Sequence, residues 1–368
     1  MILPGITRKA VNPDQIAIQV TDLIDQLALS HILSKQEYLY LLNHLSLREL
    51  PYLSDKARTL TDTIYGKNVF FRGLIEISNI CAQGCYYCGL QSDNPHVSRY
   101  RMHPDQILET VDEGYRLGFR SFVWQGGEDP YFTDELLIAL LQEFKKRYPD
   151  CVVTLSIGER SRTSYQNLYD AGLDRYLLRH ETASPELYAK LHPATMSFQH
   201  RMQCLKDLKE IGYWVGAGFL INPPHQTNED LVSDLLFLQE FQPHMCGIGP
   251  FIPHPETRFR NEVNGSSDQT VALLALVRLI VPEVLLPSTT ALGTVDPDGR
   301  AKGFAAGGMV VMPNLTPPEI RKFYEIYAEK KNWGDEAAEN VRRSVAAVES
   351  SGYTAALTRG DHVRYKEK

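Results

Sequence analysis

The chain has 368 residues, of which 43% are hydrophobic and 23% are charged, and its formal net charge is −7. This length suits one large α/β barrel or two ordinary domains, and the composition is ordinary for a globular enzyme. The negative charge offers no polybasic surface, so neither nucleic acid nor an anionic membrane is expected as a partner. The N-terminus lacks the apolar core of a signal peptide, and Arg278 and Pro282 interrupt the most apolar segment. We therefore expect a cytoplasmic protein without a membrane span.

Helical periodicity dominates the first part of the chain, and eight short apolar or β-branched runs follow it, with amphipathic segments between most of them. The runs are 69–78, 120–127, 151–158, 173–181, 213–221, 245–252, 284–292 and 308–313. Apolar strands that alternate with helices are typical of a covered parallel sheet, so the pattern predicts an α/β fold, a (βα)8 TIM barrel. An open doubly wound sheet is the alternative, but no glycine-rich loop follows the first run. The predicted parts are an N-terminal helical extension, the barrel and C-terminal helices that close the barrel, at residues 1–66, 67–314 and 315–368.

Polar and glycine-rich segments follow six of the predicted strands, from CAQGCYYC after the first to PSTTALGT after the seventh. Turn residues at strand ends are expected in any protein, which explains the glycines and prolines. Turns do not explain Gln125, Glu128, Arg179 and Glu181, which adjoin apolar strand interiors. Because active sites of such barrels lie at the carboxyl ends of the strands, these side chains are candidate site residues.

Three cysteines, Cys81, Cys85 and Cys88, stand close together directly after the first predicted strand. Thiolates are soft ligands that select zinc, copper(I) or iron–sulfur clusters. A structural zinc site is closed by four ligands, and His96 or His103 could supply the fourth here. A [4Fe–4S] cluster held by only three thiolates leaves one iron with an open position, which a catalyst uses and an electron carrier avoids.

The C-x3-C-x2-C spacing, with the aromatic Tyr87 before the last cysteine, resembles the signature of the radical S-adenosylmethionine (SAM) enzymes. Over about residues 65–328 the chain is similar to the HydE family of [FeFe]-hydrogenase maturases within that superfamily. The segments that carry this similarity are RYRMHPDQI, QGGEDPYF, TLSIGE, DRYLLRHETASPELYAKLHP, GIGPFIPHPET and MPNLTP. Biotin synthase and methylornithine synthase are relatives with the same barrel.

The resemblance implies two cofactors, one [4Fe–4S] cluster on the three cysteines of the loop and SAM, which chelates the open iron. Reductive cleavage of SAM would give a 5′-deoxyadenosyl radical. Some family members carry a second cysteine trio near the C-terminus, but no cysteine follows Cys246 here, so a second cluster is not expected. We interpret Cys151, Cys204 and Cys246, which lie in apolar surroundings, as small buried hydrophobic residues.

The resemblance also implies which residues bind SAM. Without side chains at Gly126 and Gly127, the backbone of QGGED can approach the methionine amino group, and Glu128 adds an acceptor. Gly126 stands where relatives have serine, so a side-chain contact is not expected there. Tyr87 and Ser156 are further expected SAM contacts.

Two charged residues are also expected to serve SAM, Glu181 at the ribose hydroxyls and Arg201 at the carboxylate. The alternative for both is a structural ion pair. The expected substrate residues in the barrel lumen are Arg72, Gln125, Arg179, Thr289, Thr290 and Tyr324. Strand alternation places Glu76 on the same face as Arg72, so these two side chains are expected to pair.

The resemblance implies an enzyme that matures the [FeFe]-hydrogenase active site, with a cysteine-bound Fe(CO)2(CN) precursor as substrate. Its expected partners are the tyrosine-cleaving maturase that delivers this precursor, the other hydrogenase maturases, and reduced ferredoxin or flavodoxin as electron donor. A methylornithine-synthase-like mutase is the alternative within the superfamily. An iron–sulfur electron carrier and a zinc-stabilised binding module are the alternatives outside it.

Overall fold

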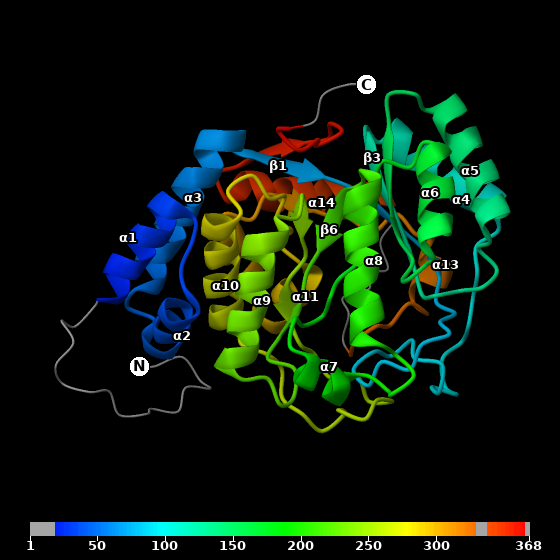
Figure 1. Ribbon diagram of the computed structural model, residues 1–368. Coiled ribbons are helices and arrows are strands. Elements are labelled where there is room, and N and C mark those ends of the chain that lie inside the picture. Colours follow the sequence, from blue (N-terminus) through cyan, green and yellow to red (C-terminus); the bar gives the residue numbers. More distant parts are fainter. Residues whose placement is uncertain (1–18, 329–336, 365–368) are drawn as a thin grey trace.

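The computed structural model describes residues 19–328 and 337–364. Three helices precede the barrel, namely α1 (Val20–Ser30), α2 (Lys35–His44) and α3 (Leu50–Tyr65). They lie together against one side of the molecule, where α3 packs on α10 (Ser267–Ile280) and α2 packs on α9 (Asn228–Phe241) (Figure 1). Their buried faces are made by leucine, isoleucine and tyrosine side chains that recur at helical spacing.

Parallel strands form a closed barrel. They are β1 (Asn68–Phe71) with β2 (Gly73–Ser78), β3 (Ser121–Gly126), β4 (Val152–Ser156), β5 (Arg175–Leu177), β6 (Trp214–Ala217) with β7 (Leu220–Ile221), β8 (Met245–Cys246) with β9 (Gly249–Pro250), residues 284–287, and β10 (Val310–Val311). Six of them form one parallel sheet in the order β2-β3-β4-β5-β6-β8. Residues 284–287 bridge β8 to β10, and Leu74 pairs with Asn314 to complete the ring. The predicted (βα)8 barrel is therefore confirmed, because all eight predicted runs take part in the ring.

Most of the remaining helices of the barrel cover the outer face of these strands, with α9 and α10 side by side in Figure 1. The remaining helices are α4 (Pro104–Arg116), α5 (Asp134–Arg147), α6 (Arg162–Asp170), α7 (Pro185–Leu191), α8 (Phe198–Ile211), α9, α10, α11 (Thr290–Val295) and α12 (Gly299–Ala305). Helix starts carry side-chain caps, as in α9, where Thr227 accepts a hydrogen bond from the backbone N–H of Asp230. In the described part of the chain, none of the helices is long and apolar enough to cross a membrane.

The C-terminal part differs from the expected set of helices. It contains α13 (Pro318–Arg321) and α14 (Ala337–Ser350), but then a strand, β11 (Thr354–Ala356), which pairs in parallel with β1. The pairing is available because β3 joins the first strand only from Gly73 onward, which leaves the backbone edge of β1 open. Three small residues carry too little periodicity to predict a strand, and the partner is supplied by tertiary structure.

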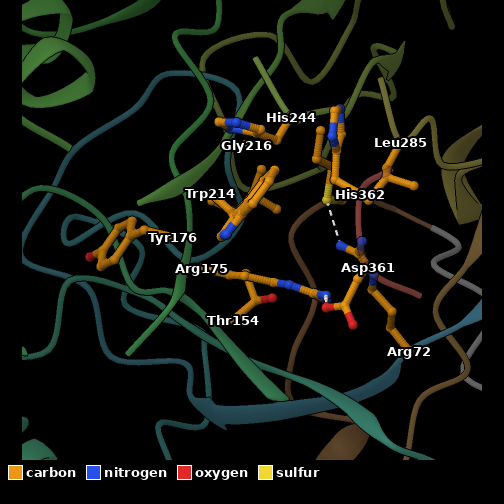
Figure 2. A pocket seen from close by; sticks show the side chains of 12 residues that line it. Arg72, Thr154, Arg175, Tyr176, Trp214, Gly216, His244, Leu285, Asp361 and His362 are labelled. Atoms are coloured by element: carbon orange, nitrogen blue, oxygen red, sulfur yellow. Dashed lines mark hydrogen bonds and ion pairs between the residues drawn. The ribbon is translucent and has the colours of Figure 1, made fainter. Parts of the chain in front are cut away.

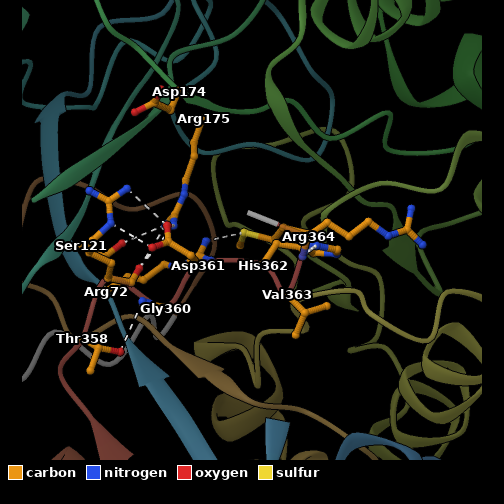
Figure 3. A network of polar contacts seen from close by, with 12 residues as sticks. Arg72, Ser121, Asp174, Arg175, Thr358, Gly360, Asp361, His362, Val363 and Arg364 are labelled. Atoms are coloured by element: carbon orange, nitrogen blue, oxygen red, sulfur yellow. Dashed lines mark hydrogen bonds and ion pairs between the residues drawn. The ribbon is translucent and has the colours of Figure 1, made fainter. Parts of the chain in front are cut away.

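This C-terminal part covers both ends of the barrel. At the amino ends of the strands, Asp361 forms an ion pair with Arg175, and both belong to a buried polar network (Figure 3). At the carboxyl ends, residues 321–328 cross the loop after β2, where the N–H of Gly89 donates to the carbonyl of Ile326. The C-terminal part therefore closes the amino end of the barrel with a polar network, and its residues 321–328 cover the carboxyl end.

Candidate active site

A cavity of about 370 Å³ lies at the carboxyl ends of the strands, and we call it the carboxyl-end cavity. It brings together most of the predicted site residues from loops and strands that are far apart in the sequence. Those that line it are Cys81, Cys85, Tyr87, Cys88, Gln125, Gly126, Gly127, Glu128, Arg179, Glu181, Arg201, Thr289, Thr290 and Tyr324. This is the position that the barrel architecture assigns to an active site.

The three-cysteine loop forms one wall of this cavity. The loop is held to the end of β3 by the N–H of Ala82, which donates to the carbonyl of Glu128 at 2.9 Å. Burial raises the pKa of the Cys81 and Cys85 thiols above the usual range and raises the pKa of Cys88 to about 12. For Cys85 and Cys88, the charge of a neighbouring cysteine raises the pKa further. Cysteine ligates a metal as the thiolate and not as the thiol, so a metal bound here must displace these protons.

The backbone of Gly127 makes room for this loop. A Cβ atom at Gly127 would lie 2.7 Å from Cβ of Cys81 and closer still to the carbonyl oxygen of Ile80. Gly126 is less constrained, since its nearest neighbour would be the Ser78 carbonyl oxygen at 3.2 Å. Glycine at 127 is therefore a packing requirement of the cysteine loop.

Glu128 is fixed beside the first cysteine. Its carboxylate accepts hydrogen bonds from Nε2 of Gln83 at 2.6 Å and from the N–H of Glu159 at 3.0 Å. Burial raises the pKa of Glu128 in spite of these bonds. Gln83 lines the cavity too, and nothing in its sequence context indicated this role.

Arg179 and Glu181 also line the cavity, and they hold buried polar atoms without hydrogen-bond partners in the described part of the chain. Their side chains form an ion pair with Nη2 and Oε2 3.3 Å apart. Yet Nε and Nη2 of Arg179 and Oε2 of Glu181 are buried and make no hydrogen bond to the described residues. Unsatisfied charged atoms are costly to bury, so their position at a cavity wall indicates a polar ligand.

The backbone at Glu181 supports the same conclusion. Its φ of 65° lies in the left-handed region, which costs a residue other than glycine about 1–3 kcal/mol. The conformation is held by hydrogen bonds on both sides, from the N–H of Glu181 to the Gly218 carbonyl and from the N–H of Leu220 to the Glu181 carbonyl. Such strain is typical of functional positions, and here it aims the carboxylate at the cavity.

Arg201 forms the structural ion pair that the sequence left open, with a partner other than Glu181. Its Nε lies 2.5 Å from Oε1 of Glu159, and its Nη1 donates to the carbonyl of Arg179 at 3.0 Å. Burial opposes the charge, but the attraction of Glu159 raises the pKa of the Arg201 guanidinium. Arg201 thus belongs to a structural ion pair and also lines the cavity. Glu159, its partner, was missed from the sequence, although it ends the segment SIGE after the third strand.

The remaining wall carries the predicted threonines and tyrosine. Thr289 caps α11, and Thr290 accepts a hydrogen bond from Nη2 of Arg300 at 3.3 Å. Nε2 of Gln125 donates to the hydroxyl of Tyr324 at 3.2 Å, which ties the C-terminal cover to β3. Arg300 also lines the cavity and was missed from the sequence, because it lies in α12, beyond α11, with no local pattern to distinguish it.

Arg72 lies elsewhere, at the opposite end of the lumen. It lines a second, much smaller cavity of about 20 Å³ together with Arg175 and Asp361, the amino-end cavity (Figure 2). Its Nη1 donates to the sulfur of Met245 at 2.8 Å. The expected pairing with Glu76 is wrong, because four residues of strand separate the two side chains by about 13 Å. Glu76 lines the carboxyl-end cavity instead and accepts from Nδ2 of Asn314.

Ser156 and the two histidines of the zinc alternative also lie outside the cavity lining. Ser156 ends β4 beside Gln125, but among the described residues it is not one of those that line the cavity. His96 and His103 are exposed and lie near Glu256 and Asp105 respectively. Neither histidine lines the cavity, so the structure places no histidine of this pair as a fourth ligand beside the cysteine loop.

Comparison with known proteins identifies the family. Residues 75–238 match the model of the radical SAM superfamily. The chain is 46% identical over 265 residues to the [FeFe] hydrogenase maturase subunit HydE of Thermotoga maritima, covering 72% of this chain and 75% of that protein. It is 27% identical to 3-methylornithine synthase of Methanosarcina acetivorans, covering 76% and 79%. The crystal structure of methylornithine synthase shares the fold, with a TM-score of 0.79 at 24% identity over 91% of this chain and 97% of that one. The chain belongs to the HydE family of hydrogenase maturases and is a radical SAM enzyme.

Proposed function

We propose that the enzyme cleaves SAM reductively and directs the 5′-deoxyadenosyl radical at a cysteine-bound Fe(CO)2(CN) precursor of the [FeFe]-hydrogenase active site. One observation carries this proposal. Three thiols line the carboxyl-end cavity together with buried charged atoms that lack hydrogen-bond partners among the described residues. The kinship with the Thermotoga maritima hydrogenase maturase supports the choice of substrate.

The residues present fit a [4Fe–4S] cluster with SAM. Cys81, Cys85 and Cys88 offer three thiolates from one loop, which leaves one iron open. When bound, the cluster with SAM at its open iron supplies the electron that cleaves the sulfonium. SAM carries both signs of charge at its methionine end, and the cavity offers both, with Glu128 and Arg201 near the cysteine loop.

In this proposal the protein side chains orient SAM and do not take part in bond breaking. The unsatisfied Oε2 of Glu181 accepts hydrogen bonds from the ribose hydroxyls. Arg201, held by Glu159, donates to the SAM carboxylate through a pre-oriented guanidinium. Because Glu181 is strained and Arg201 is anchored, neither side chain has to be ordered when SAM binds.

The substrate side of the cavity is suited to an anion. Arg179 brings unsatisfied donors, the half-buried Arg300 donates to Thr290, and Thr289 adds a hydroxyl. A cysteine carboxylate or an iron–cyanide group would satisfy these donors. Tyr324, Ile326 and Tyr327 of the cover line the same cavity.

The proposed partners follow from this chemistry. Reduced ferredoxin or flavodoxin would deliver the electron, and the tyrosine-cleaving maturase would supply the iron precursor to this enzyme among the other hydrogenase maturases. All six cysteines are free thiols, which accords with a reducing compartment such as the cytoplasm.

The test begins with the cluster. Anaerobic reconstitution should give about four irons per chain. Replacing Cys81, Cys85 or Cys88 by alanine should remove them, whereas replacing Cys151 or Cys246 by serine should not. Iron loss in the two serine variants, with iron retained in the alanine variants, would overturn the ligand assignment.

The substrate is tested by the rate at which 5′-deoxyadenosine forms from SAM and dithionite. The iron–cysteine precursor should raise this rate above the substrate-free background, and Arg179→Ala should abolish the stimulation while the iron content stays unchanged. Stimulation by lysine, with methylornithine as product, would instead assign the chain to the mutase alternative.

A further inference from the structure

Outside the carboxyl-end cavity, three side chains of metal-binding type gather between β4 and α8. His200 and Cys204 lie one helical turn apart on α8, and Glu159 follows β4. One ligand atom from each lies within 4.8 Å of the other two. Cys204 was interpreted from the sequence as a buried hydrophobic residue, and it is buried, but its sulfur faces a histidine.

The spacing of these atoms matches a tetrahedral metal site. Nε2 of His200 lies 3.5 Å from Oε2 of Glu159 and 3.6 Å from Sγ of Cys204. Zinc binds nitrogen and oxygen at about 2.1 Å and sulfur at about 2.3 Å, so tetrahedral ligands lie roughly 3.4–3.6 Å apart. Two of the three ligand separations therefore already have the values of a ligated set.

The surroundings of the three side chains also suit a metal. Oε1 of Glu159 is occupied by Arg201, which leaves Oε2 to face His200 and Cys204. A ligand carboxylate that is itself hydrogen-bonded is typical of metal sites, because the second bond fixes its orientation. The i, i+4 spacing of His200 and Cys204 is the spacing by which one helix offers two ligands to zinc. The His200 side chain is 57% exposed and provides the route of entry.

We propose that Glu159, His200 and Cys204 form a three-ligand site for a divalent cation of zinc type, with water as the fourth ligand. A set of carboxylate, imidazole and thiolate favours zinc over magnesium or calcium, which prefer oxygen ligands. Binding releases the thiol proton of Cys204 to solvent, and no oxidant or reductant is needed. Because Glu159 also holds Arg201 at the cavity wall, the ion is joined to the active site through one side chain.

The test measures zinc binding to the cluster-reconstituted enzyme, in which the three loop cysteines are occupied. Equilibrium dialysis with a competing chelator, followed by metal analysis, should find one zinc per chain in addition to the iron. His200→Ala removes an exposed side chain and should weaken zinc binding at least tenfold without loss of fold. Cys204→Ser should weaken it as well, and zinc should raise the melting temperature of the wild type but not of His200→Ala.

Two matched controls separate this site from chance binding. His96 is also an exposed histidine beside a glutamate, Glu256, so His96→Ala should leave zinc affinity unchanged. Cys151 is a buried cysteine elsewhere, and Cys151→Ser should do the same. Equal zinc affinity in the wild type and in His200→Ala would overturn the site. Because neither SAM nor substrate is present, this result is independent of the proposed reaction.

Discussion

Gly127 offers a direct test of how the fold positions the cluster ligands. In Gly127→Ala the new Cβ would lie 2.7 Å from Cβ of Cys81. Non-bonded carbons are most stable at about 3.5–4.0 Å, so the loop must move by about 1 Å. Metal–ligand distances tolerate about 0.2 Å, which is several times less than this shift. We therefore expect Gly127→Ala to lose most of its iron on reconstitution, together with SAM cleavage.

The matched control for this substitution is Gly84→Ala, which lies within the cysteine loop itself. A Cβ at Gly84 would meet Pro193 at 3.5 Å, which is ordinary contact, and its iron content should stay near that of the wild type. The assay is iron per chain and the cluster absorbance after anaerobic reconstitution, with thermal melting of the metal-free proteins alongside. A Gly127→Ala enzyme with about four irons and normal SAM cleavage would refute the reasoning.

Two further predictions concern other parts of the molecule. Glu181→Gln removes the charge that we assign to the ribose and should weaken SAM binding about ten- to a hundredfold, measured by calorimetry, because a charged hydrogen bond contributes about 1.5–3 kcal/mol. Unchanged SAM affinity with a large fall in melting temperature would mean a structural role. Asp361→Asn breaks the ion pair with Arg175 and should destabilise the fold by roughly 3 kcal/mol in denaturant unfolding at neutral pH, with normal iron content. Burial would raise the pKa of Asp361, but hydrogen bonds from Arg359 and the charge of Arg175 lower it. The pair therefore stabilises the fold above about pH 4, and the effect is lost as the pH falls through the lowered pKa, so the difference between wild type and variant should vanish in acid.

The barrel and its cysteine loop could be predicted from the sequence because both depend on local patterns. Apolar runs alternating with helices specify parallel strands, and the position of polar residues at strand ends specifies the active face. Gln125, Glu128, Arg179 and Glu181 were found in this way, and all four line the carboxyl-end cavity. The carboxyl ends of the strands meet at one end of the closed barrel, which brings these side chains together, although Ser156 at the end of β4 does not line the cavity.

The missed features depend on tertiary structure that no local pattern records. β11 forms because β1 leaves an edge open, and its sequence of three small residues has no strand signal of its own. Glu159 acquires its role from a partner distant in the chain, Arg201, and Arg300 reaches the cavity from α12, a helix that follows the seventh strand only after α11. Alternation along a strand shows which face a residue takes, but it does not show which end of the lumen that residue reaches.

Arg72 shows why the end of the lumen matters for function. Apolar side chains, among them Leu177, Met245 and Leu285, pack in the lower lumen around Arg72. Its charge is therefore confined to the amino-end cavity and cannot bind a substrate in the carboxyl-end cavity. Arg300 instead lines the carboxyl-end cavity together with Arg179, and we propose that it serves the substrate there. Arg179 is paired with Glu181 but keeps buried donors without hydrogen-bond partners within the described ranges. The proposal of an anionic substrate therefore rests on these donors and on Arg300, and it does not depend on Arg72.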